Sequence, residues 1–180
     1  MDEQTVIAAM RKWIEKAVIG LNLCPFAKAV YVKNQVRYVV SRAPHLDGFL
    51  EDLDRELDFL AAADPAEVDT TLLIHPTLLT DFLDFNDFLQ LAEAAVDEHK
   101  LDGVIQIASF HPRFQFEGTE PDDLGNYTNR APFPTLHLLR EASIERAVAA
   151  FPEAETIYQR NIETLEALGI EGWQSLWEKP

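Results

Sequence analysis

The sequence predicts an α/β or α+β protein built on one small sheet, and three observations support this class. Two short apolar runs rich in branched residues, 70–74 and 103–110, are typical of buried strands. Segments with helical patterns of apolar residues alternate with these runs, as expected when strands are joined through helices. A chain of 180 residues can bury a substantial core, so we expect a single domain over residues 1–180. The sheet should have three to four strands, parallel or mixed, covered by helices.

Apolar residues at helical spacing predict three helices in the first half of the chain, over residues 4–19, 46–63 and 79–99. Gly20 is suited to end the first of these helices. Residues 24–30 are expected to form a short helix with Pro25 in its first position. The alternative for this segment is a strand through residues 30–32.

A further strand is expected at residues 36–41, ahead of the two apolar runs. Right-handed crossovers would make the three strands neighbours, in an order that the sequence leaves open. Pro134 is expected to begin a helix that runs to about Ala150, and the following helix should end at Gly169. The chain should therefore finish in a helical segment.

The net charge of −16 is concentrated in the middle of the chain. Residues 47–125 carry a net charge of −17, whereas residues 1–46 carry +4. A chain this acidic is a poor partner for nucleic acid, because neutralising phosphates requires clustered Lys and Arg. The acidic middle is interpreted as two solvated helix faces, or alternatively as a surface for a basic partner.

Several features favour a cytoplasmic protein without a membrane partner. No run approaches the roughly 18 apolar residues of a membrane span. The first residues are acidic and lack the basic and apolar regions of a signal peptide. Cys24 is the single cysteine, which excludes an intramolecular disulfide and fits a reducing compartment.

Both apolar runs end in the same dipeptide, His75-Pro76 and His111-Pro112. Proline cannot donate to a sheet ladder, so it ends each strand and leaves the histidine at the carboxyl end. Ligands of open α/β sheets bind outside these ends. We therefore expect His75 and His111 at one rim, as acid–base residues or, alternatively, as imidazoles bonded to the backbone.

Residues 112–133 have little periodicity and many polar side chains, which is unusual for a connection of this length. The segment is interpreted as a loop that binds an anionic substrate, or alternatively as a network of side chains that satisfy one another. Asp122 or Asp123 could orient a histidine. The predicted substrate-binding residues, which include one arginine from the following helix, are Arg113, Asn126, Asn129, Arg130 and Arg140.

His137 and Glu141 are four residues apart and would share a face of the helix predicted after Pro134. They could be a surface pair, or His137 could assist catalysis if the loop folds the helix start over the rim. In that arrangement His75, His111, His137 and Glu141 would suit a divalent metal, although acid–base chemistry requires no cofactor.

Cys24 has two interpretations. At the start of a short helix, the helix dipole would favour a thiolate, which could act as a nucleophile beside a rim histidine. The alternative is a buried structural cysteine.

Five segments together resemble an uncharacterised bacterial family, the domain-of-unknown-function family numbered 1415. They are residues 20–27 (Gly-Leu-Asn-Leu-Cys-Pro-Phe-Ala), 70–76, 109–116, 126–141 and 160–165. The resemblance covers nearly the whole chain. It implies no activity and no catalytic residue, so the function must be argued from the site.

The leading hypothesis is an enzyme that acts on a small anionic metabolite by acid–base or hydrolytic chemistry at the rim. One alternative is a metalloprotein with a His/Glu site. The other is a non-catalytic binding or scaffold protein that uses its acidic helices, residues 47–99. Substrate and oligomeric state are left open.

Overall fold

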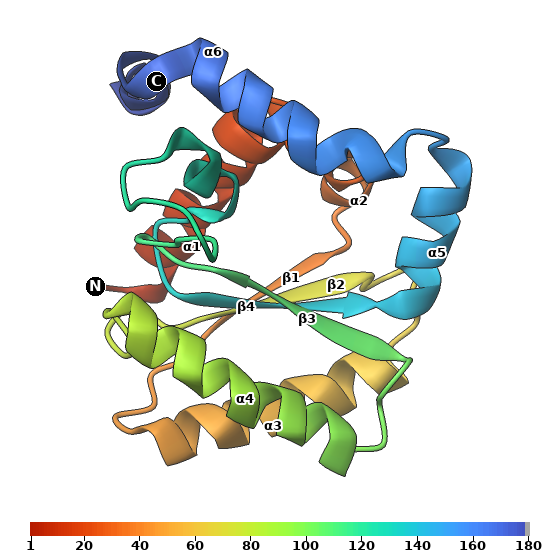
Figure 1. The fold of residues 1–180 in the computed structure, drawn as a ribbon. Helices are drawn as coiled ribbons and strands as arrows, with labels where there is room; N and C mark the ends of the chain where they lie inside the picture. The colour runs from red at the N-terminus through yellow and green to blue at the C-terminus, as the bar shows by residue number, and fades with distance from the viewer. Residues whose placement is uncertain (179–180) are drawn as a thin grey trace.

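A four-stranded mixed sheet lies at the centre of residues 1–178, the part of the chain that the computed structural model describes (Figure 1). The strands are β1 (Val36–Val40), β2 (Thr70–Ile74), β3 (Ile105–Phe110) and β4 (Thr135–Arg140), in the order β1-β2-β4-β3. β1 and β2 are parallel, and β4 is antiparallel to both of its neighbours. β1, β2 and β3 therefore end at one edge, which we call the carboxyl edge. The predicted fold class is confirmed.

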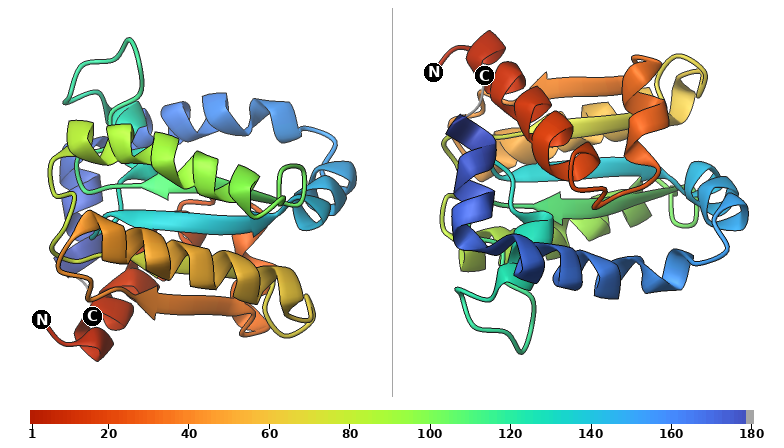
Figure 2. Two further views of the ribbon diagram at one scale, coloured as in Figure 1. Left: turned by 90° about the horizontal axis from the view of Figure 1, so that it is seen from below. Right: turned by 90° about the horizontal axis from the view of Figure 1, so that it is seen from above.

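Helices cover both faces of the sheet (Figure 2). α3 (Leu46–Ala62) and α4 (Phe82–Glu98) cover one face. The opposite face carries α1 (Glu3–Trp13), its π-helical continuation (Ile14–Ile19) and α6 (Ile157–Glu178). Two shorter helices, α2 (Ala27–Val32) and α5 (Glu141–Ala150), precede β1 and follow β4. No helix in the described part of the chain is both long and apolar enough to cross a membrane.

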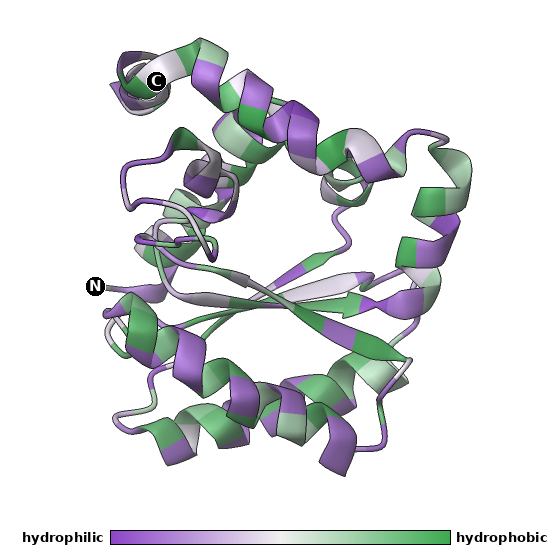
Figure 3. Ribbon diagram, viewed as in Figure 1, coloured by the Kyte–Doolittle hydropathy of each residue, from purple (hydrophilic) through white to green (hydrophobic). Residues whose placement is uncertain are grey.

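Each face of the sheet buries its own hydrophobic core, because alternate residues of a strand point to opposite sides. Leu73, Leu136 and Leu138 are fully buried against α3 and α4. Leu72 and Ile74 are buried against α1 and α6. Apolar and polar residues are interleaved along α3 and α4, as expected of helices with one buried side (Figure 3).

α1 and α4 begin at capping aspartates, and α6 is interrupted at a glycine. Asp81 begins α4 by accepting hydrogen bonds from the amides of Leu83 and Asp84, and Asp2 accepts one from Thr5 in the same way at α1. Gly169 has a φ of 68°, which interrupts α6 between residues 168 and 170, where a helix end was predicted. Residues 30–32 are helical, so the alternative strand there is wrong.

The helix predicted to begin at Pro134 is wrong in its first part. Residues 135–140 form β4, which is hydrogen-bonded between β2 and β3. β3 is therefore not a neighbour of β2, contrary to the prediction. Tertiary pairing overrides helix propensity here, since Leu136 and Leu138 enter one core while His137 faces the other side.

Truncation of Leu138 tests this placement of β4. We expect Leu138→Ala to lower the free energy of unfolding by about 2–5 kcal/mol, because the residue is fully buried between β2 and β3. Leu83→Ala is the matched control, since Leu83 is 71% exposed and should change stability by less than about 0.5 kcal/mol. Urea unfolding checks both variants. Equal losses would contradict the assigned core.

Candidate functional site

The two strand–His–Pro endings lie at the carboxyl edge, as predicted. His75 follows β2 and His111 follows β3, with β4 beginning between these strands. Both histidines are buried, at 1% and 0% exposure. Their imidazoles are therefore withdrawn from solvent, unlike the accessible groups that a catalytic rim requires.

The His75 ring is hydrogen-bonded to backbone groups at both nitrogens. Its Nε2 lies 2.9 Å from the carbonyl oxygen of Ala43, in the loop after β1. Its Nδ1 lies 2.9 Å from the amide nitrogen of Leu78. A carbonyl can only accept and an amide can only donate, so Nε2 carries the proton and the ring is neutral.

The His111 ring repeats this arrangement. Its Nε2 lies 2.9 Å from the carbonyl oxygen of Leu79, in the loop after β2, and its Nδ1 lies 3.0 Å from the amide nitrogen of Arg113. The same argument fixes a neutral ring with the proton on Nε2. Each histidine thus joins the end of its own strand to the loop after an earlier strand. We call these two arrangements the histidine bridges.

Burial keeps both rings neutral. It lowers the pKa of His75 and of His111, although the carbonyl acceptor of each ring opposes this effect. Phe49 packs edge-on against His75 at 5.2 Å between ring centroids, and Phe85 lies 5.0 Å from His111. The backbone-bonded alternative describes both histidines, and their geometry gives no support to an acid–base role.

Asn126 is the centre of a hydrogen-bonded network in residues 112–133. Its side-chain oxygen accepts from the Phe116 amide and the Thr119 hydroxyl, each at 2.9 Å. Its amide group donates to the carbonyl of Glu120 at 2.8 Å. Both ends of this buried side chain are therefore used within the segment.

Three other polar candidates of this segment, Arg130, Asn129 and Asp123, are also bonded locally. Arg130 donates to the carbonyls of Phe114 and Pro121 and lies 4.3 Å from the Tyr127 ring centroid. Asn129 donates to the carbonyl of Ser109 at 3.0 Å. Asp123 accepts from the Glu120 amide. Asp122 and Arg113 are exposed. This geometry matches the alternative in which the side chains satisfy one another.

His137, Arg140 and Glu141 do not join the rim histidines, so the predicted convergence is wrong. His137 lies within β4 on the sheet face opposite to α3 and α4, and Glu141 begins α5. Arg140 ends β4 at the other edge of the sheet, where it donates to the carbonyls of Ala63 and Val68. The missed strand is the cause, because it separates these residues from the carboxyl edge.

His137 is bonded to Thr70 of the neighbouring strand. The Thr70 hydroxyl donates to the carbonyl of Leu138 at 2.7 Å, so it accepts from His137 Nε2 at 2.6 Å. Burial lowers the pKa of His137 to about 4. Within residues 1–178, no three His, Cys, Asp or Glu side chains are grouped so that they could hold a metal ion. The predicted metal set of His75, His111, His137 and Glu141 is therefore not assembled.

Cys24 lies in the turn before α2, which begins at Ala27, so Pro25 is not the first helical residue. Burial raises the pKa of the Cys24 thiol, and the amides of Phe26 and Ala27 only partly oppose this effect. The thiolate expected from the helix dipole is not supported. The geometry agrees with a structural cysteine.

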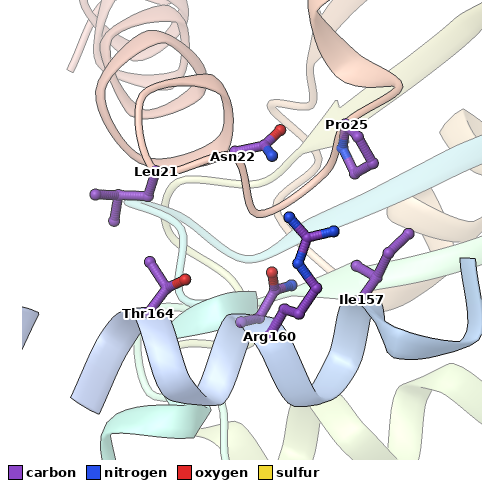
Figure 4. Close-up of a pocket in the computed structure, with 7 residues that line it drawn as sticks. Leu21, Asn22, Pro25, Ile157, Arg160 and Thr164 are labelled. Carbon is purple, nitrogen blue, oxygen red and sulfur yellow. The ribbon is translucent and has the colours of Figure 1, made fainter. Parts of the chain in front are cut away.

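The sequence reasoning missed a polar pocket between the turn before α2 and α6 (Figure 4). Its volume is about 110 Å³. The lining residues are Leu21, Asn22, Pro25, Ile157, Arg160, Asn161 and Thr164. Asn161 is buried and donates to the carbonyl of Leu23 at 2.8 Å, so it holds the two walls together.

Arg160 gives this pocket its charge. The side chain extends from α6 across the pocket toward the turn that carries Asn22 and Pro25 (Figure 4). Of the nine arginines, all within the described residues, Arg113 and Arg160 have no side-chain hydrogen bond, ion pair or aromatic contact. In a chain with 31 acidic and 15 basic residues, a free guanidinium in a pocket is a candidate anion site.

A family model described as "Protein of unknown function (DUF1415)" matches residues 5–175, which confirms the family predicted from the sequence. That the family is bacterial stays a prediction. No curated protein matches the chain, and no solved structure does. Residues 20–27 and 160–165, two of the segments that carry the resemblance, together provide six of the seven residues that line the Arg160 pocket.

Acidification tests the environment of His137. The folded pKa of about 4 lies below the ordinary 6.5, so the unfolded chain binds more protons between these values. The stabilisation is complete above pH 6.5 and decreases as the pH falls toward 4, by about 1.4 kcal/mol per pH unit or about 3 kcal/mol in all. We expect His137→Gln to make the loss of unfolding free energy over this range shallower.

Urea unfolding at several pH values measures this slope. His45→Gln is the control for the substitution of a histidine by glutamine, because His45 is exposed. If His137→Gln and the wild-type protein lost stability in parallel, His137 would not be the buried neutral group described.

Proposed function

The chain belongs to this family of unknown function, and we propose that the protein binds a small anionic metabolite in the pocket lined by Arg160. The observation that carries the proposal is an exposed guanidinium that lines a polar pocket and forms no ion pair within residues 1–178. Arginine binds carboxylates and phosphates through two parallel hydrogen bonds, which makes these groups its natural ligands. The ligand class, a small anionic metabolite, is the one predicted from the sequence. The proposed site is the Arg160 pocket instead of the carboxyl edge.

The size of the pocket limits what it holds. Pockets that enclose a whole drug-sized ligand have volumes of roughly 300–1,000 Å³. A pocket of about 110 Å³ accommodates only the anionic group of a metabolite, while the remainder of the molecule lies outside. Asn22 and Asn161 add side-chain amides that can donate to further oxygens of that group.

The local charge favours an anion in spite of the acidic chain. Residues 1–46, which form one wall, carry a net charge of +4. The acidic residues are concentrated in 47–125, the segment that includes α3 and α4 on the opposite side of the sheet. An anion approaching Arg160 therefore meets one wall from the basic segment 1–46, whereas the other wall, α6, carries acidic residues beside Arg160.

Binding, rather than turnover, is the function that this geometry supports. Among the residues that the structure describes, those lining the pocket include no histidine or carboxylate that could transfer a proton, and burial raises the pKa of the neighbouring Cys24 thiol. The acid–base or hydrolytic chemistry predicted at the rim would use histidines that are occupied by backbone groups. Cytoplasmic location stays a prediction.

Substitutions of Arg160 and Arg113 distinguish anion binding in this pocket from anion binding at the carboxyl edge. Inorganic phosphate and malonate are titrated at constant ionic strength into ¹⁵N-labelled protein, and the amide shifts of residues 20–24 and of Asn161 are followed by NMR. We expect saturable shifts, with binding weakened at least about tenfold in Arg160→Gln, since about 1.4 kcal/mol of charged hydrogen bonding is lost. Arg113→Gln, at the other unpaired arginine, should leave binding unchanged.

The opposite pattern, in which Arg113→Gln abolishes the shifts and Arg160→Gln does not, would place the anion at the carboxyl edge, beside Arg113. The absence of saturable shifts with both probes would also contradict the proposal.

A further inference from the structure

A groove lies beside α4 at the carboxyl edge, far in the fold from the Arg160 pocket. Its volume is about 480 Å³. Leu46, the first residue of α3, and Leu79, in the loop before α4, form one part of its lining. Phe88 and Leu91 line it from α4 itself. Four of its eight lining residues are thus apolar, and the others are Thr80, Asp81, Asp84 and Asp87.

The α4 residues of the groove form one continuous stripe. Asp84, Asp87, Phe88 and Leu91 are spaced three or four residues apart, so they share one face of the helix. A stripe of this spacing beside a groove is the geometry that receives an amphipathic helix, whose own anchors recur at the same spacing.

Large apolar side chains are accessible here. Leu91 of α4 is 49% exposed and Leu46 of α3 is 41% exposed, and both line the groove. Exposed leucines that line a concave surface are typical of a binding site, whereas scattered ones are not.

The rim of the groove is acidic and lacks basic partners. Asp84 and Asp87 are exposed, and within residues 1–178 neither forms an ion pair. Asp81, which caps α4, adds a third carboxylate. These residues belong to the 47–125 segment with its net charge of −17. The complementary surface is one that carries apolar anchors flanked by Lys or Arg.

The histidine bridges hold the groove in shape. Leu79 has a φ of 58°, a conformation that leucine rarely adopts, and its carbonyl accepts the hydrogen bond of His111. Phe88 stacks on Phe49, which packs edge-on against His75. A surface ordered before binding loses less entropy when a partner docks.

We propose that this groove binds a basic amphipathic helix of a partner protein. A second copy of the chain would bring the same acidic rim against itself, and an anionic membrane surface would be repelled in the same way. The proposal is independent of the Arg160 pocket, because the two sites share no residue.

Peptide binding to the full chain tests the proposal. The probe is a fluorescent Leu/Lys peptide of about 18 residues, designed as an amphipathic helix, and the control peptide has the same composition in scrambled order. Fluorescence anisotropy should show saturable binding of the helical peptide and at least about tenfold weaker binding of the scrambled one. Equal binding of the two peptides would overturn the proposal, because attraction would then depend on charge alone.

Matched variants locate the contact on α4. Leu91→Ser should weaken binding at least about tenfold, whereas Leu83→Ser, at an exposed leucine outside the groove lining, should not. Asp84→Asn with Asp87→Asn should weaken binding and reduce its dependence on salt, whereas Asp97→Asn with Asp102→Asn should do neither. Equal effects within either pair would overturn the assignment.

Sedimentation of the chain without peptide tests the competing occupant. A monomer is expected. A dimer that is lost in Leu91→Ser but kept in Leu83→Ser would overturn the proposal in favour of a second copy in the groove.

Discussion

Two neutral imidazoles close the carboxyl edge of the sheet, and the arrangement of the surrounding loops depends on them. His75 joins the end of β2 to the loop after β1, and His111 joins the end of β3 to the loop after β2. The second bridge passes the start of β4, which separates β2 from β3. Each ring also accepts an amide hydrogen bond from its own loop. Without the rings, these backbone groups would lose their partners, at a cost of about 1–3 kcal/mol for each one that water cannot reach.

The bridges occupy both nitrogens of each edge histidine with backbone groups. An imidazole that donates at one nitrogen and accepts at the other has no position left for a substrate proton. At this edge, the bridges instead hold residues of the groove beside α4 in place. His111 fixes Leu79 through its hydrogen bond. His75 packs against Phe49, which stacks on Phe88. The anion site that we propose at Arg160 lies on the other side of the sheet, where α6 meets the turn before α2. The two proposed sites thus use opposite layers of the fold and opposite charges.

Local patterns in the sequence were sufficient for much of the fold but for little of the site. The His-Pro pairs correctly located the ends of two strands, because proline acts on the strand that contains it. β4 was missed, because Leu136 and Leu138 are compatible with helix or strand and only pairing with β2 and β3 decides between them. The ring partners of His75 and His111 could not be predicted, since they are carbonyls of loops 32 residues away. The Arg160 pocket joins segments still further apart, as the bond between Asn161 and Leu23 shows.

The protonation states of His75 and His111 test this account most directly. Long-range ¹H–¹⁵N correlation spectra of the imidazoles, assigned with His75→Gln and His111→Gln variants, report the tautomer and charge of each ring across pH. The account predicts that both rings carry one proton, on Nε2, from pH 8 down to pH 6.5, because burial lowers the pKa of each below its ordinary value of 6.5. Titration of either ring near pH 6.5, or a proton on Nδ1, would contradict it and return the histidines to the list of catalytic candidates.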